Sequence, residues 1–120
     1  MMTLRSTPTA PIDEDRLDLV FKALSDRTRR QMLAMLSRGS ATVSELAAPF
    51  DMSLPAASKH LKVLENAQLV IRTKSGRVQT CTFQPDPMAH ADQWLEHYRV
   101  FWNNRLESLK SYLEDKDSDT

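Results

Sequence analysis

The fold is decided by residues 53–70, which read SLPAASKHLKVLENAQLV. Ser53 is suited to accept a hydrogen bond from a free amide at the start of a helix, and Pro55 is tolerated in a first turn because its missing donor has no partner there. Apolar residues then recur at helical spacing and predict one amphipathic helix. Its expected buried stripe consists of Leu54, Ala57, Leu61 and Leu64.

The opposite face of this predicted helix combines small residues with cations, namely Pro55, Ala56, Ser58, Lys59 and Lys62. No acidic residue occurs in the segment before Glu65. A helix that only faces solvent usually carries both signs of charge, whereas small residues beside cations suit close approach to a polyanion. We therefore expect this face to read DNA.

Length and composition indicate one domain with a modest core, since the chain has 120 residues. Two glycines in the whole sequence leave no nucleotide-binding glycine loop and favour a mainly helical fold. The single cysteine excludes an intramolecular disulfide. Neither a signal peptide nor a membrane-spanning segment is recognisable, so we expect a cytoplasmic protein with no membrane partner.

Charge is distributed unevenly along the sequence, although its net value is zero. Residues 22–80 carry ten cations and four acids, a net charge of +6, and the two ends carry the remaining −6. A basic reading surface with acidic flanks would produce this asymmetry, which favours a nucleic-acid partner. The alternative for this feature alone is ordinary solvated charge.

Two helices are expected ahead of the reading segment. Residues 1–12 lack apolar periodicity and predict a flexible N-terminal arm. Acids at a helix start, followed by apolar residues at helical spacing, predict a first helix over residues 13–25. A second helix is expected over residues 26–37, with Asp26 as its cap and Gly39 as its stop.

A short helix and a turn lie between these helices and the reading segment. Thr42 and Glu45 have the spacing of a capping box and predict the start of the short helix. Pro49 is expected to end it, and a tight turn then leads to Ser53. A short helix, a tight turn and a longer helix are the arrangement of a helix-turn-helix.

A basic hairpin is expected directly after the reading helix. Residues 69–73 and 78–83 are strand-like, and the turn between them places Gly76 where a positive φ is needed. Such a hairpin is a wing. The predicted fold is therefore mainly α with a small β-hairpin, a winged helix-turn-helix of order α-α-α-α-β-β-α over residues 13–114.

A last helix over about residues 88–114 carries one broad apolar stripe, and residues 115–120 are expected to form a flexible acidic tail. The stripe consists of Trp94, Leu95, Tyr98, Phe101, Trp102, Leu106, Leu109, Tyr112 and Leu113. One chain of this length has little core to cover so wide a face, so we expect a dimer interface; the alternative is that the stripe packs on its own domain. Arg105 lies inside the stripe and needs a buried or half-buried carboxylate partner. The candidates are Asp18, Glu14 and Glu107.

Four segments, in the same order, resemble the ArsR family of winged-helix repressors. They read ALSDRTRR at residues 23–30, VSELA at 43–47, SKHLKVL at 58–64 and LV at 69–70, followed by Gly76-Arg77. The resemblance implies a homodimeric repressor that binds an operator, releases it on a cellular signal and commonly regulates its own operon. It also implies that the first and last helices form the dimer interface, where Leu17, Val20 and Phe21 would join the stripe.

One departure from the family pattern lies between the reading helix and the first wing strand. Members often have glycine there, whereas this chain has Gln68. A left-handed backbone at Gln68 would cost about 1 kcal/mol.

The expected DNA contacts follow from a two-fold dimer on an imperfect palindrome, with its reading helices in successive major grooves about 34 to 36 Å apart. Residues expected at base edges or adjacent phosphates are Ser53, Pro55, Ala56, Ser58 and Lys59. Further contacts to the DNA backbone are expected from Lys62, Arg29 and Arg30, and at flanking minor-groove phosphates from Lys74 and Arg77. His60 lies beside the reading face as a packing or phosphate-contacting residue.

No metal site or other cofactor is expected. Many ArsR-type repressors bind a metal through a cysteine pair on the short helix, or through acidic and histidine ligands along the last helix. This chain has neither, and its nearest cluster is His90, Asp92 and His97, in which the histidines are two turns apart. A metal-responsive repressor with a site shared between subunits remains an alternative, and no residue pattern identifies a small-molecule effector.

Cys81 and the aromatic helix leave further alternatives open. Cys81 is either a redox switch or, as its alternation with Phe83 favours, a buried small residue. A winged helix that uses its aromatic helix to hold a protein partner, without binding DNA, is the alternative function, and the basic middle of the chain weighs against it. No nucleophile motif, phosphate loop or acid pair indicates an enzyme.

Overall fold

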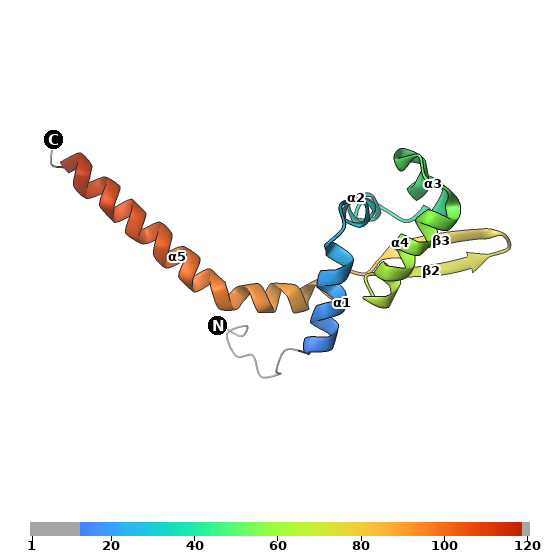
Figure 1. Ribbon diagram of the computed structural model, residues 1–120, viewed down its shortest axis with the longest axis horizontal. Helices are drawn as coiled ribbons and strands as arrows, with labels where there is room; N and C mark the ends of the chain where they lie inside the picture. Colours follow the sequence, from blue (N-terminus) through green and yellow to red (C-terminus); the bar gives the residue numbers. More distant parts are fainter. Residues whose placement is uncertain (1–12, 119–120) are drawn as a thin grey trace.

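The computed structural model describes residues 13–118, and the predictions made for residues 1–12 and 119–120 lie outside this range. The described elements are, in order, α1 (Glu14–Leu24), α2 (Arg27–Leu36), β1 (Ala41–Thr42), α3 (Val43–Ala47), a 3₁₀ helix η2 (Ala48–Phe50), α4 (Leu54–Asn66), β2 (Val70–Ser75), β3 (Val78–Phe83) and α5 (Met88–Ser118). In Figure 1 the first four helices gather beside the β2–β3 hairpin, and α5 leads away from them. The predicted winged helix-turn-helix fold is confirmed.

The helix starts are fixed by cap side chains. Those of α2, α3 and α4 were predicted from the sequence, whereas Asp13 was predicted only as one of the acids at the start of α1. Asp13 and Asp26 each accept a hydrogen bond from the backbone amide three residues further on, at 3.1 and 3.0 Å. Thr42 and Glu45 form both bonds of the capping box, at 3.1 and 2.8 Å. Ser53 caps α4 at 3.2 Å. These bonds satisfy amides that have no partner within the helix, so each start is specified locally.

The sheet contains one strand more than the sequence predicts. Its order is β1-β3-β2, and the two residues of β1 pair antiparallel with Cys81 and Thr80 of β3. A two-residue strand carries too little periodicity to be recognised. The predicted hairpin is confirmed, with Ser75 opposite Val78 and a two-residue loop in which Gly76 has a φ of 62°. Glycine fits this position because the tight hairpin loop requires a positive φ.

One hydrophobic core joins the first four helices to the sheet. Its largest fully buried side chains are Met32, Leu46, Leu61, Leu64, Leu69, Val20 and Cys81. The predicted stripe of α4 is buried except for Leu54, which is 52% exposed and lines an open groove instead. The predicted burial of Cys81 is confirmed, and this burial raises the pKa of its thiol.

The last helix, α5, is longer than predicted and only its beginning joins the core. Ala91 is buried and Trp94 packs partly against the core, whereas every residue from Leu95 to Lys116 is exposed. Residues 115–118 continue the helix, which corrects the predicted start of a flexible tail. Its 31 residues span about 46 Å at the rise of an α-helix. Among residues 13–118, no helix combines the length and the apolar character needed to cross a membrane.

Candidate nucleic-acid interface

The turn between α3 and α4 sets the direction of the reading helix. α3 ends at Ala47, η2 continues the chain through Pro49, and Asp51 then adopts a left-handed backbone with a φ of 51°. Aspartate is among the few residues that tolerate this conformation, so it takes the place that glycine often fills in such a turn. Ser53 follows and starts α4.

The outer face of α4 presents cations beside small side chains. Lys59 and Lys62 are exposed, and neither forms an ion pair with another residue in the described range 13–118. Ser53 and Pro55 are exposed in the first turn, and Ala56 is half-buried. A phosphate backbone is therefore able to approach this face without meeting an opposing carboxylate.

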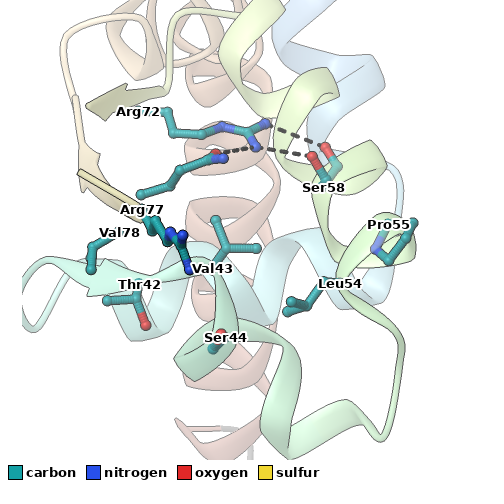
Figure 2. A pocket seen from close by; sticks show the side chains of 10 residues that line it. Thr42, Val43, Ser44, Leu54, Pro55, Ser58, Arg72, Arg77 and Val78 are labelled. Atoms are coloured by element: carbon teal, nitrogen blue, oxygen red, sulfur yellow. Dashed lines mark hydrogen bonds between the residues drawn. The ribbon is translucent and has the colours of Figure 1, made fainter. Parts of the chain in front are cut away.

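An open groove of about 480 Å³ separates the first turns of α4 from the wing. Leu54, Pro55 and Ser58 line it from α4, and Arg77 lines it from the wing (Figure 2). Three residues predicted from sequence to contact DNA, Pro55, Ser58 and Arg77, thus share one concave surface. Lys74 is exposed on β2, opposite Gln79 on β3, and does not line the groove.

Arg72 joins the wing to the reading helix, a role that the sequence did not reveal. From β2 its guanidinium donates to Glu65 Oε1 on α4 through Nη2 at 2.5 Å and Nε at 3.1 Å. Nη1 donates to Ser58 Oγ at 2.9 Å and to Gln79 Oε1 at 3.1 Å (Figure 2). The Arg72 side chain is only 14% exposed. These bonds fix the wing against α4 over two helical turns.

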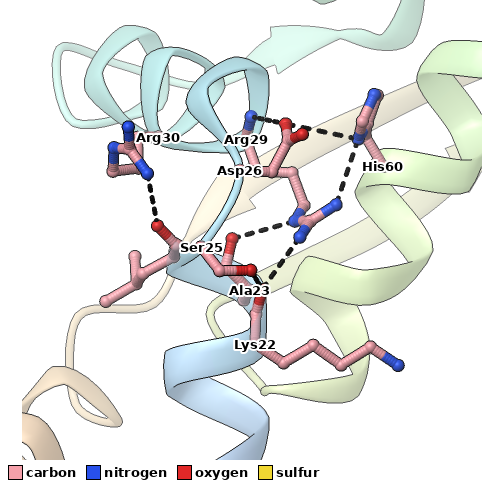
Figure 3. A network of polar contacts seen from close by, with 8 residues as sticks. Lys22, Ala23, Ser25, Asp26, Arg29, Arg30 and His60 are labelled. Carbon is pink, nitrogen blue, oxygen red and sulfur yellow. Dashed lines mark hydrogen bonds and ion pairs between the residues drawn. The ribbon is translucent and has the colours of Figure 1, made fainter.

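Arg29 connects the corner between α1 and α2 to the reading helix (Figure 3). It donates through Nε to the carbonyl oxygen of Ala23 and through Nη2 to that of Lys22, both at 2.8 Å. Its Nη1 lies 3.3 Å from Nδ1 of His60 on α4. The carbonyl of Lys22 also accepts from the amide and the hydroxyl of Ser25, at 3.2 and 2.7 Å, so Arg29 adds a further donor at this helix end and supplies one to Ala23. All three guanidinium nitrogens of Arg29 therefore contact groups of its own chain, whereas the sequence analysis predicted a phosphate contact for this residue.

Two neighbours complete this corner. Arg30 donates through Nη1 to the carbonyl oxygen of Leu24 at 2.7 Å and is otherwise exposed. Asp26 Oδ2 lies 3.8 Å from His60 Nδ1. The backbone amide of Arg29 lowers the pKa of the Asp26 carboxyl, and the Arg29 guanidinium and His60 lower it further, against the opposite effect of burial.

Comparison with known sequences agrees with this geometry. The model of the bacterial regulatory proteins of the arsR family matches residues 26–72, from the cap of α2 into β2. The transcriptional regulator Rv2034 of Mycobacterium tuberculosis is 33% identical over 103 residues, which cover 86% of this chain and 94% of that protein. The chain belongs to the ArsR family. The transcriptional repressor SdpR of Bacillus subtilis is 30% identical over 79 residues, 66% of this chain and 88% of that protein.

Solved structures include two informative ArsR-type neighbours. The ArsR family transcriptional regulator RHA00566 is 44% identical, with a TM-score of 0.71 over 76% of this chain and 94% of that one. A homodimeric winged helix-turn-helix DNA-binding domain from Mycobacterium bovis is 28% identical, with a TM-score of 0.57 over 78% and 84% of the two chains. The chain is therefore a DNA-binding transcriptional regulator of the ArsR family and not an enzyme.

In this ArsR-family chain the apolar stripe of α5 lies open. Phe101 and Trp102 are 67% and 65% exposed, and the stripe residues from Leu95 to Leu113 are all exposed. Near the start of the stripe, the ring of Phe21 on α1 meets Trp94 edge-on, with 5.5 Å between centroids. Leu17 and Val20, which were also predicted at the dimer interface, are buried in the hydrophobic core of the single chain. They face the core because they lie on the inner side of α1.

The carboxylate partner predicted for Arg105 is not found among residues 13–118. Arg105 is exposed, and among residues 13–118 it forms no ion pair with Asp18, Glu14 or Glu107. Arg99 forms the ion pairs of this helix instead, with Asp92 at 2.6 Å and with Glu96.

The histidines of α5 are not gathered into a metal site within the described part of the chain. No group of three histidine, cysteine, aspartate or glutamate side chains between residues 13 and 118 is placed to hold an ion. Asp92, the acid between His90 and His97, is paired with Arg99.

Proposed function

We propose that this protein is a homodimeric repressor that binds a two-fold symmetric operator through α4 and the β2–β3 wing, and that it regulates its own operon. The observation that carries the proposal is the outer face of α4, where Lys59 and Lys62 have no carboxylate partner among residues 13–118. The repressor name of the Bacillus subtilis relative supports repression. A regulator of this kind acts where the chromosome is, so the proposal includes a cytoplasmic location.

In the proposed complex α4 enters the major groove and the wing lies over the flanking backbone. Lys59 and Ser58 face base edges, Ser53, Pro55 and Ala56 lie close to the groove wall, and Lys62 contacts a phosphate. Lys74 and Arg77 reach phosphates beside the minor groove. Arg30 retains unused donors for a backbone contact, whereas Arg29 acts by holding His60 in place.

The proposed dimer forms through α5 and the exposed edge of α1. Its interface is expected to contain Phe21, Trp94, Leu95, Tyr98, Phe101, Trp102, Arg105, Leu106 and Leu109. So large an exposed apolar stripe is unusual for a protein that stays monomeric. The homodimeric Mycobacterium bovis neighbour supports this assembly. Two-fold symmetry would then place two α4 helices on half-sites one helical turn, about 34 to 36 Å, apart.

Two measurements on the full chain test the proposal. Sedimentation at micromolar concentration is expected to give a dimer, and selection from random 30-base-pair duplexes is expected to recover a motif with two symmetric half-sites. The affinity for that motif should fall steeply between 50 and 200 mM salt because phosphate contacts release counterions. A monomer that binds no duplex at low salt would overturn the proposal.

A further inference from the structure

We propose that Arg72 determines which side chains donate hydrogen bonds in the groove between α4 and the wing. The groove then selects hydrogen-bond acceptors on DNA and disfavours cytosine at the base that Ser58 contacts. The proposal rests on the function proposed above, because it requires α4 to lie in the major groove. It concerns a positioning residue: Arg72 acts on DNA through Ser58 and Gln79.

Glu65 on one side of the Arg72 guanidinium, and Ser58 and Gln79 on the other, determine its orientation. Glu65 Oε1 accepts from both Nε and Nη2, at 3.1 and 2.5 Å, so the plane of the guanidinium is set by this carboxylate. Because the group is planar and its donors are rigidly placed, Nη1 then points toward Ser58 and Gln79. With its side chain only 14% exposed and its charge paired with Glu65, Arg72 is not itself placed as a phosphate contact.

This arrangement favours Ser58 as a donor, because a hydroxyl that accepts from a cation becomes a stronger donor and a weaker acceptor. A serine hydroxyl has one proton and two acceptor lone pairs. Ser58 Oγ accepts from Arg72 Nη1 at 2.9 Å, so its proton points away from the guanidinium. No group in the described range 13–118 accepts that proton, not even the carbonyl of Leu54 one turn earlier, which is the usual local acceptor. The O–H bond is therefore available to the groove that Ser58 lines.

Arg72 also determines which end of the Gln79 side-chain amide faces the groove. Its Oε1 accepts from Arg72 Nη1 at 3.1 Å, which leaves the amide NH₂ as the end of the side chain free to face the groove. Arg77 carries only donors. Thr42 Oγ1, at the floor of the groove, accepts from the amide of Glu45 at 3.1 Å. Ser44 also lines the groove and is not constrained by Arg72, so it can both donate and accept.

The DNA groups that fit such a surface are acceptors. Phosphate oxygens are acceptors, and these suit Gln79 and Arg77 on the wing. In the major groove guanine offers N7 and O6, adenine N7 and thymine O4, whereas cytosine offers only the N4 donor. The Ser58 hydroxyl on α4 can therefore donate to guanine, adenine or thymine on the strand that it contacts. A cytosine there would have to donate to the one remaining lone pair of Ser58, which is a poorer acceptor because the oxygen already accepts from the Arg72 cation. We expect binding to weaken about ten-fold, within the range for base contacts.

The test compares variants on duplexes that carry each of the four bases at every position of the selected motif. The wild-type chain is expected to disfavour cytosine at one position in each half-site, and Ser58→Ala to lose all preference there. The double variant Glu65→Gln with Arg72→Met removes the charge pair together, so no buried carboxylate is left unpaired. Without the guanidinium, both lone pairs of the Ser58 oxygen are available to cytosine N4, and discrimination against cytosine should fall to within about two-fold.

Arg77→Met is the matched control, because it removes a guanidinium from the same wing without touching Ser58. It should weaken binding to all four bases alike and keep the discrimination. If Arg72 only holds the wing in place, the double variant will behave like this control, and the proposal is wrong. If circular dichroism shows that the double variant does not fold, Arg72→Lys gives the same comparison. This variant keeps the ion pair with Glu65 but has no second terminal nitrogen to donate to Ser58 and Gln79.

The two proposals fail in different ways. A wild-type chain that selects no symmetric motif overturns the proposed function. A wild-type chain that selects a motif but tolerates cytosine at every position, or a Ser58→Ala variant with an unchanged base profile, overturns the polarity proposal alone.

Discussion

Replacing Gln68 by glycine should stabilise the protein. Gln68 follows the end of α4 with a φ of 62°, in the left-handed region that disfavours residues with a Cβ. Its amide donates to the carbonyl of Glu65 at 2.8 Å, and the amide of Leu69 donates to that of Leu64 at 3.0 Å. These are the two bonds of a Schellman motif, whose left-handed position is usually glycine.

The magnitude combines three contributions. Relief of the left-handed backbone at Gln68 contributes about 1 to 2 kcal/mol. The greater freedom of glycine in the unfolded chain opposes this by about 0.5 to 1 kcal/mol. The side chain of Gln68 also accepts from Arg16, but both groups are exposed and Arg16 has Asp13 as a second partner, so this loss is small. A net gain of about 0.5 kcal/mol remains, which raises the Tm by about 2 to 4 °C.

Thermal unfolding at one fixed protein concentration measures this difference, since a dimer would make the Tm depend on concentration. Gln68→Ala is the matched control: it removes the same bond to Arg16 but keeps a Cβ in the left-handed region. We expect the order Gln68→Gly above wild type above Gln68→Ala. A glycine variant that melts no higher than the alanine variant would refute the reasoning.

Four further predictions concern DNA, stability and assembly. Lys59→Ala should weaken binding to the selected operator by about 1 to 3 kcal/mol more than binding to a scrambled duplex; equal losses would reject base reading by Lys59. Arg77→Ala should weaken binding to both duplexes alike and reduce the slope of log K against log salt by about one. Asp26→Ala removes the cap of α2 and should lower the free energy of unfolding by about 1 kcal/mol at pH 7. Because the pKa of Asp26 is lowered in the folded protein, this stabilisation is complete above the unfolded pKa of about 3.9 and is lost as pH falls through the folded value; the gap between wild type and variant in urea unfolding should be smaller at pH 3 than at pH 7, and a constant gap would contradict the assignment. Trp102→Glu should leave the single-chain fold intact, since the side chain is 65% exposed, and should shift sedimentation from dimer to monomer.

Local chemistry explains which elements were predictable from the sequence. The starts of α1, α2, α3 and α4 depend on one cap side chain and an amide three residues away, so the relevant residues stand next to each other in the sequence. The wing was predictable for the same reason, because its loop and both strands are consecutive. The short strand β1 was not, since only its pairing with β3 defines it.

The parts of the site that escaped prediction depend on contacts between distant residues. Arg72 was counted only as one cation among ten, yet its partners lie seven and fourteen residues away on two other elements. Leu17 and Val20 were assigned to the dimer interface from the family resemblance, which names the first helix without saying which of its faces the chain's own core covers. The engagement of Arg29 with the end of α1 also requires the folded corner to be known.

The bonds of Arg29 have a mechanical consequence. One guanidinium holds the last carbonyls of α1 at 2.8 Å and contacts the ring of His60 on α4 at 3.3 Å. α1 also packs against α5 through Phe21 and Trp94. A signal that tilts α1 against its neighbours would therefore either carry the reading helix with it or break these bonds. The Arg29 side chain is thus a direct polar link between the end of α1 and the reading helix, beside the apolar core that the two helices share.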